Sequence, residues 1–191
     1  GENGSGKTTL MKTLLGINIK HTGSVRFEGF TKREIGWLPQ KTQHQKDFPA
    51  SVREVVLSGF AGKGFFGAFY KKGIKNQALK NMQILGITDI AEKSFSELSG
   101  GQQQKVLLCR ALCAAKKVLL LDEPVTGLDS ASSEEMYNLI KKLNASGMAI
   151  IMISHDIDRS LCEAKHILNL TDNGFFFGTV SEYREYAKGD K

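Results

Sequence analysis

The first nine residues of the chain, Gly1 to Thr9, fit the phosphate-binding pattern G-x-x-x-x-G-K-[ST]. Glycines in such a loop let successive backbone N–H groups face the β- and γ-phosphates of a nucleotide. Lys7 would reach the terminal phosphates, and the Thr8 hydroxyl would bind Mg²⁺. A helix from Thr8 to about Leu15 would direct its positive end at the anion. The candidate ATP-binding residues are Gly1, Glu2, Asn3, Gly4, Ser5, Gly6, Lys7, Thr8 and Thr9.

A pair of carboxylates follows a continuous apolar run, Val118 to Leu121. Such a run is expected of a parallel strand covered on both faces, and it delivers Asp122 and Glu123 at its carboxyl end, where ligands bind in open α/β sheets. Asp122 would hold Mg²⁺, directly or through water, and Glu123 would be the general base for water attacking the γ-phosphate. The alternatives are a simple polar strand end here and an ordinary glycine-rich turn at the first motif. The presence of both motifs in one chain disfavours them.

A third motif, Leu98-Ser99-Gly100-Gly101-Gln102, precedes a predicted helix from about Gly101 to Ala115. Ser99 is placed to cap this helix. The glycine-rich start of the helix leaves N–H groups facing outward, which predicts an anion site whose anion is not obviously in the same subunit.

Together these three motifs resemble the nucleotide-binding domain of an ABC (ATP-binding cassette) transporter, across nearly the whole chain. The resemblance implies an α/β fold of the P-loop NTPase class, with a mostly parallel core sheet, a small antiparallel β part and a helical subdomain. It implies that the signature motif completes the ATP site of a second copy, in a head-to-tail dimer that encloses two nucleotides. The signature residues are Ser99, Gly100, Gly101 and Gln102. Lys105 stands where the family usually has arginine, which keeps the charge but not the fork geometry.

The resemblance assigns roles to three further residues. Gln40, after a predicted strand at Ile35 to Leu38 and a proline, matches the Q-loop and would bind Mg²⁺ or the attacking water while sensing the membrane partner. Asp129 matches the D-loop and would contact the phosphate loop of the partner. His155 follows a second apolar strand, Met148 to Ile153, and would orient Glu123 and water as the switch histidine does. The other histidines, His21, His44 and His166, are interpreted as structural.

The remaining patterns indicate the elements around these motifs. Gly23 to Gly29 alternates polar and apolar residues, which predicts a short antiparallel strand. Ser51 and Glu54 have capping-box spacing at a helix start, and a second helix is predicted from Asn76 to Leu85. We expect the aromatic residues of 62–70 to be buried in the subdomain or against a partner. Edge strands are predicted within Ile167 to Val180, around a turn at Asp172-Asn173-Gly174, before a terminal helix from about Ser181.

These elements predict a single domain over 1–191, with a helical subdomain inserted at about 47–115. A phosphate loop is expected to follow a buried strand, and no residue precedes Gly1 in this sequence. In the family this preceding part holds the first core strands and an aromatic residue that stacks on adenine, so we expect the sequence to be a fragment that lacks them.

Composition agrees with one α/β domain: 191 residues, 41% hydrophobic and 24% charged. No run of about 20 apolar residues indicates a membrane span, and no leader is indicated, so we expect a cytosolic protein. The three cysteines, with no CxxC pair, are interpreted as small buried hydrophobic residues. The net charge of +6 fits a nucleic-acid partner, an anionic membrane surface or a solvated helix face, and charge alone does not decide among them.

We therefore expect an ATP-hydrolysing subunit of an ABC transporter, with ATP and Mg²⁺ as cofactors. The segments 38–41, 47–56 and 123–129 resemble ATP-binding subunits of bacterial zinc and manganese uptake systems, which implies import of a divalent metal, zinc first and manganese or iron next. The expected partners are a second copy, an integral-membrane permease at the cytoplasmic face of the plasma membrane and, indirectly, a solute-binding protein. Nucleic acid is not expected.

Two alternatives stay open at this stage. One is an ABC-type ATPase acting on nucleic acid. Such proteins usually carry a coiled-coil insertion, a zinc module or a second cassette, and the distance from Lys7 to Ser99 leaves no room for a long insertion. The other is a non-hydrolytic module that dimerises with ATP, against which Glu123 and His155 argue.

Overall fold

The structure is a computed structural model that describes residues 1–2, 4–17, 20–40, 49–61, 65–66, 69–171 and 174–189, of which 65, 66, 69 and 189 are described by their backbone alone. The chain divides into two compact units. The terminal unit contains Gly1–Val25 and Ile153–Lys191, and the central unit contains Arg26–Met152.

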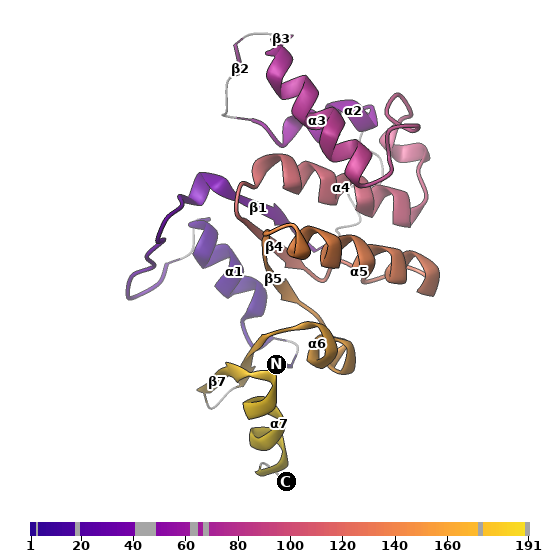
Figure 1. Cartoon of the computed structure of the whole chain (residues 1–191). Coiled ribbons are helices and arrows are strands. Elements are labelled where there is room, and N and C mark those ends of the chain that lie inside the picture. Colours follow the sequence, from indigo (N-terminus) through magenta and orange to yellow (C-terminus); the bar gives the residue numbers. More distant parts are fainter. Residues whose placement is uncertain are drawn as a thin grey trace. The chain divides into compact units, whose positions relative to one another are not determined.

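A three-stranded sheet lies in the middle of the central unit (Figure 1), with the order β1 (Ile35–Leu38), β4 (Val118–Asp122) and β5 (Ala149–Ile153). β1 and β4 are parallel, with Ile35 opposite Val118. Every residue of β4 is buried, which confirms the prediction from its continuous apolar run. β5 forms where it was predicted, but Ile151 is 48% exposed, so this strand is not covered on both faces.

Helix α4 (Gly100–Ala114) is the main helix of the central unit and buries nine side chains, which include Val106, Leu108 and Cys109. It contacts β1, α2 (Val52–Ser58) and α3 (Lys72–Ile84). α5 (Ser130–Ala145) also contacts α4. The side chains between these helices and the sheet form one continuous hydrophobic core.

Two glycines allow α4 to approach its neighbours closely. A β-carbon on Gly36 of β1 would lie 2.1 Å from the Ala111 carbonyl oxygen, and one on Gly59, at the end of α2, would lie 2.2 Å from the Arg110 carbonyl oxygen. Real β-carbons do not come within 3.0 Å of other heavy atoms, so any side chain at either position would push α4 away. The position of α4 is therefore fixed by backbone packing on two sides.

The smaller elements of the central unit connect these parts. Two 3₁₀ turns, Lys32–Glu34 and Phe95–Glu97, precede β1 and the signature motif. β2 (Phe65–Phe66) and β3 (Phe69–Tyr70) form an antiparallel pair between α2 and α3. The side chains of the three phenylalanines lie outside the described part, whereas Tyr70 packs against the core. The predicted capping box at the start of α2 is confirmed, because Ser51 and Glu54 satisfy each other's backbone N–H groups.

In the terminal unit, α1 (Lys7–Leu15) follows the phosphate loop, as predicted. β6 (His166–Thr171) and β7 (Gly174–Thr179) form the predicted antiparallel pair, and α7 (Val180–Gly189) follows. The predicted turn residues Asp172 and Asn173 lie outside the described residues. The Phe176 ring stacks on Tyr186 at a centroid distance of 4.9 Å, which holds α7 against the hairpin. α6 (Ile157–Glu163) is a short helix that buries none of its residues.

Three expectations were wrong. Residues 23–29 form no strand, because none of the described segments pairs with them and positive φ angles at Gly23 (92°) and Gly29 (75°) bend the chain at both ends. α3 begins at Lys72 instead of Asn76, since an exposed glycine in the first turn costs only about 1 kcal/mol. Cys162 is exposed because α6 is not buried, whereas Cys109 and Cys113 are buried as predicted.

The α/β fold class is thus confirmed, with a parallel strand pair, an antiparallel pair and helices. Across the helices of the described residues, none combines the length and the apolar character that crossing a bilayer requires. The predicted boundaries of the domain and of the helical subdomain stay predictions.

Candidate functional site

The phosphate loop has the backbone conformation that its glycines predict. Gly4 and Gly6 have φ angles of 87° and 88°, in the left-handed region, and Gly6 is the N-cap of α1. Successive N–H groups in such a conformation form a concave anion-binding surface at the positive end of the helix. Nothing lies within 4 Å of the β-carbon position of either glycine, so the loop has open space beside it. Asn3 lies outside the described residues.

Lys7 folds back over this loop. Its Nζ donates hydrogen bonds to the carbonyl oxygens of Gly1 (2.8 Å) and Glu2 (2.5 Å), and it lies 3.4 Å from Ser5 Oγ. These acceptors hold the ammonium above the glycine backbone, where phosphate oxygens could replace the carbonyls as acceptors. Thr8 and Thr9 occupy the first turn of α1, with Thr8 half-buried and Thr9 exposed.

In the central unit, Asp122 and Glu123 stand at the carboxyl end of β4. The Asp122 side chain is buried, in a residue that is 1% exposed. Glu123 has a φ of 51°, and within the described chain it is the one residue other than glycine with a positive φ. This conformation costs roughly 1–2 kcal/mol for a residue with a β-carbon. Strain of this kind is concentrated at active sites, where the surrounding structure maintains it.

The Glu123 carboxylate is held by two donors. Gln40 Nε2 donates to Glu123 Oε2 at 2.9 Å, and Thr126 Oγ1 donates to the same oxygen at 3.1 Å. Gln40 and Glu123 are 83 residues apart in the sequence, and the parallel pairing of β1 with β4 brings the ends of their strands together. The structure therefore joins two of the three predicted catalytic residues directly.

The signature motif opens α4. Ser99 is the N-cap, its Oγ accepts from the Gln102 N–H at 3.3 Å, and its own N–H donates to Gln102 Oε1 at 3.1 Å. Ser99 and Gly100 are exposed, whereas Gly101 is partly buried. The positive end of a 15-residue helix thus faces outward, which is an arrangement that attracts an anion.

Asp129 is the N-cap of α5. Its Oδ1 accepts from the Ser132 N–H at 2.9 Å, and its Oδ2 accepts from the Ser132 hydroxyl at 2.7 Å. The Ser132 hydroxyl and backbone N–H together lower the pKa of Asp129, so its carboxylate is charged at neutral pH. Beside it, Lys105 Nζ pairs with Glu135 Oε1 at 2.9 Å and so links α4 to α5.

His155 belongs to the terminal unit, with the phosphate loop, and is exposed in the connection between β5 and α6. The next residue, Asp156, is the N-cap of α6. The other predicted site residues belong to the central unit, namely Gln40, Ser99, Gly100, Gly101, Gln102, Asp122, Glu123 and Asp129.

Sequence reasoning missed Thr126 and Ser132, which contact the predicted residues. Each stands three positions after the carboxylate that it binds, Glu123 and Asp129. A Ser or Thr three residues after an acidic residue that precedes a helix or turn is a signal that could have found both.

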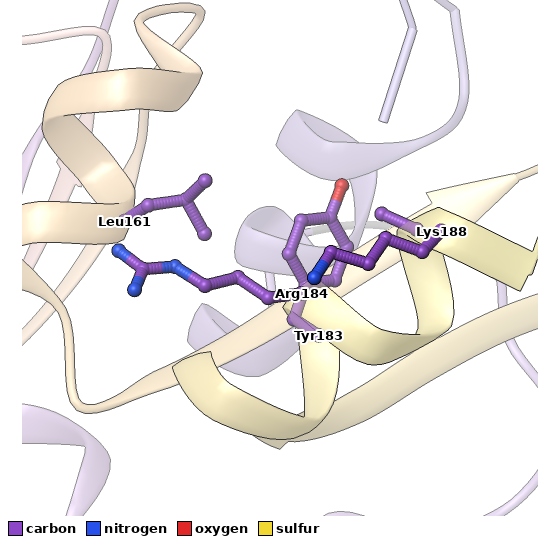
Figure 2. A pocket seen from close by; sticks show the side chains of 5 residues that line it. Leu161, Tyr183, Arg184 and Lys188 are labelled. Carbon is purple, nitrogen blue, oxygen red and sulfur yellow. The ribbon is translucent and has the colours of Figure 1, made fainter.

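The terminal unit also contains a pocket between α6 and α7 (Figure 2). It has a volume of about 300 Å³ and is lined by Leu161, Tyr183, Arg184, Ala187 and Lys188. Arg184 extends from α7 towards Leu161 of α6. None of the residues predicted to bind ATP lines this pocket, so it is not the nucleotide site.

Comparison with known proteins gives the family. The family described as ABC transporter matches residues 1–126. The chain is 34% identical to the zinc uptake system ATP-binding protein ZurA of Listeria monocytogenes, over 97% of this chain and 76% of that protein. It is 35% identical to the manganese transport system ATP-binding protein MntB of Bacillus subtilis, over 82% of this chain and 64% of that protein.

A solved structure has the same fold. The crystal structure of a nucleotide-free ATP-binding cassette from an ABC transporter superposes with a TM-score of 0.82 at 25% identity, over 97% of this chain and 81% of that one. The phosphate loop, the acidic end of β4 and the signature at the start of α4 occur here in one such fold. The chain belongs to the ABC transporter family and is an ATPase, which binds and hydrolyses ATP.

Proposed function

We propose that this ATPase powers the import of a divalent metal ion, with zinc as the first candidate and manganese or iron next. The proposal is supported by the names of its relatives, which belong to zinc and manganese systems. The zinc and the manganese relative match the chain almost equally, at 34% and 35% identity, so overall identity does not rank the two metals. Zinc is placed first because of the resemblance of short segments. In such a system the metal passes through the membrane partner and never enters this subunit.

The observation that carries the hydrolytic mechanism is the strained, doubly hydrogen-bonded Glu123. Two donors, Gln40 and Thr126, fix one carboxylate oxygen at the end of a buried strand. A general base must hold a fixed position relative to the water that it deprotonates. In this mechanism Glu123 accepts a proton from the water that attacks the γ-phosphate in line. His155, which follows β5, orients Glu123 and this water.

The phosphate loop supplies charge stabilisation. The N–H groups around Gly4 and Gly6 and the Lys7 ammonium bind the β- and γ-phosphates, and they match the charge that the transferring phosphoryl group carries. Mg²⁺ would be held by the Thr8 hydroxyl, the Asp122 carboxylate and the Gln40 amide, which are oxygen ligands of the kind that this ion prefers. When bound, the ion neutralises charge on the phosphate oxygens.

We further propose that two copies form a dimer around two ATP molecules. The start of α4 faces outward, with Ser99 and Gly100 exposed, which supports binding of an anion held by another subunit. The γ-phosphate of the ATP held by the partner subunit is bound by the signature residues Ser99, Gly100, Gly101 and Gln102. Asp129 contacts the phosphate loop of the partner subunit. Closing and opening of this dimer drives an integral-membrane permease at the cytoplasmic face, to which a solute-binding protein delivers the metal.

The first experiment compares the native protein with Glu123→Gln. An amide oxygen at position 123 can still accept from Gln40 and Thr126, so the fold is preserved while the base is lost. We expect phosphate release to fall by about 10²- to 10⁴-fold and ATP to trap the variant as a dimer. Glu28→Gln, which changes an exposed carboxylate outside the motifs, should behave as the native protein does. Normal turnover by Glu123→Gln would show that another group is the base.

A second experiment tests the substrate. Cells that lack this gene are supplied with either the native gene or the Glu123→Gln gene, and uptake of radioactive zinc and manganese is measured separately. Zinc uptake that only the native gene restores supports the proposal. Restored uptake of manganese alone would reassign the metal, and no effect on either would reject import of zinc and manganese.

A further inference from the structure

The D-loop and the signature motif meet at one side chain of α5. Both carboxylate oxygens of Asp129 are bound by Ser132, at 2.9 Å by its N–H and at 2.7 Å by its hydroxyl. The Ser132 hydroxyl is thus fixed in direction, because a hydroxyl has only one proton to donate. Asp129 is the N-cap of α5, and Ser132 is the third residue of the same helix, so the helix itself brings the two side chains together.

The other side of Ser132 faces the signature. A β-carbon on Gly101 would lie 2.6 Å from Ser132 Oγ and 3.0 Å from Ser132 Cβ. Because real β-carbons do not approach other atoms within 3.0 Å, the start of α4 packs directly on the Ser132 side chain. Any side chain at position 101 would therefore force the Ser132 side chain to move.

A second contact follows one turn further along both helices. Lys105, four residues after Gly101, pairs through Nζ with both carboxylate oxygens of Glu135, at 2.9 and 3.0 Å. The Lys105 side chain is only 16% exposed, so its position is well defined. Two successive contacts between α4 and α5 restrict rotation of one helix start against the other.

We infer that Ser132 is a positioning residue of the ATP-dependent dimer, which holds the Asp129 carboxylate and the start of the signature helix in one fixed arrangement. This inference rests on the proposed function, in which both groups bind the same nucleotide site of the partner subunit. Two groups that engage one target bind best when their separation is set in advance, because ordering them during association lowers affinity. In this role Ser132 acts through Asp129 and Gly101, the two groups that it contacts in this chain.

The test uses Ser132→Ala in the protein with Glu123→Gln, which accumulates the ATP-bound dimer. Alanine removes the bond from the hydroxyl to Asp129 but keeps the capping N–H, and it is the strongest helix former. Ser130→Ala, at an exposed position in the first turn of the same helix, is the matched control. Sedimentation gives the dissociation constant of the dimer, and fluorescence titration gives ATP binding by the monomer.

We expect Ser132→Ala to weaken the ATP-bound dimer about 10-fold, because the Asp129 side chain of each subunit must then be ordered during association, while ATP binding by the monomer stays that of the control. Asp129→Asn combined with Ser132→Ala should be no worse than Asp129→Asn alone, because the two residues act as one unit. Equal dimerisation of Ser132→Ala and Ser130→Ala, or additive effects in the double variant, would overturn the inference. If the protein with native Ser132 fails to dimerise, the proposed function is wrong and the inference falls with it.

Discussion

Among the described helices, α2 and α4 both begin with a serine that makes the same reciprocal capping hydrogen bonds, and only α4 is expected to bind ATP. Ser51 Oγ accepts from the Glu54 N–H at 3.3 Å, and Ser99 Oγ accepts from the Gln102 N–H at 3.3 Å. In both cases the side chain of the third helical residue accepts the serine N–H in return. Ser51→Ala and Ser99→Ala should therefore each cost about 1 kcal/mol of stability, a fall of about 2–4 °C in melting temperature for a chain of this length.

The effect on dimerisation should differ between the two variants. The Ser99 hydroxyl is proposed to bind the γ-phosphate of the partner, and a hydrogen bond to a charged group contributes about 1.5–3 kcal/mol. A symmetric dimer has two such sites, so Ser99→Ala loses about 3 kcal/mol or more. The dissociation constant of the ATP-bound dimer should rise at least about 100-fold. Ser51 caps α2, outside the signature motif, and its variant should dimerise normally.

Sedimentation of both variants in the Glu123→Gln protein with saturating ATP measures this difference, and thermal unfolding checks the shared loss of stability. The reasoning is refuted if the two variants dimerise equally, since the Ser99 hydroxyl would then act only as a helix cap. It is also refuted if Ser99→Ala unfolds at a much lower temperature than Ser51→Ala, because the loss of dimer would then be a loss of fold.

The structure makes three further predictions. Gly36→Ala should destabilise the protein by about 3 kcal/mol, because the added methyl group pushes β1 away from α4. Gly73→Ala, with nothing near its β-carbon, should stabilise the protein by up to about 1 kcal/mol. Equal melting temperatures of the two variants would contradict the close approach of β1 and α4. Thr126→Val should slow hydrolysis about 5-fold, since Glu123 loses one donor worth about 1 kcal/mol, and unchanged phosphate release would exclude this role. The Lys116 ammonium, 2.8 Å from the Glu34 carboxylate, and the backbone and hydroxyl of Thr31 lower the pKa of Glu34 from 4.5 to about 2. The stabilising contribution of Glu34 is therefore present above pH 4.5 and is lost as the pH falls towards 2. The deficit in melting temperature of Glu34→Gln should disappear over that interval, and a deficit independent of pH would exclude the ion pair as its cause.

Local patterns were sufficient to predict much of this fold. The buried strand β4, the capped start of α4 and the box at Ser51 all depend on residues that are close in the sequence, and each was found within a residue. The segment 23–29 has a clear alternation but forms no strand, because a strand also needs a hydrogen-bonded neighbour, which alternation cannot supply. The start of α3 was missed because its N-cap, Lys71, makes no capping hydrogen bond through its side chain, and the first turn contains Gly73, a poor helix former.

In the candidate site, too, residue types could be predicted from local sequence, whereas contacts between distant segments could not. Residue types identified Gln40 and Glu123 separately, but the bond between them depends on the pairing of β1 with β4, across 83 residues. The positive φ of Glu123 has no signal in its residue type, because the surrounding structure imposes it against the preference of a side chain with a β-carbon.

The packing of α4 also explains how distant motifs can act together. Its carboxyl-terminal half is fixed by the close approach of Gly36 and Gly59, while its start rests on Ser132 of α5. Gly36 lies on the strand that leads to Gln40, so a shift of that strand would move α4 as a rigid body, because close-packed backbones cannot absorb the displacement locally. The signature at the start of α4 would move with it. In the proposed dimer, a change sensed near Gln40 would thus alter how the signature meets the nucleotide of the partner, without any contact between the two motifs.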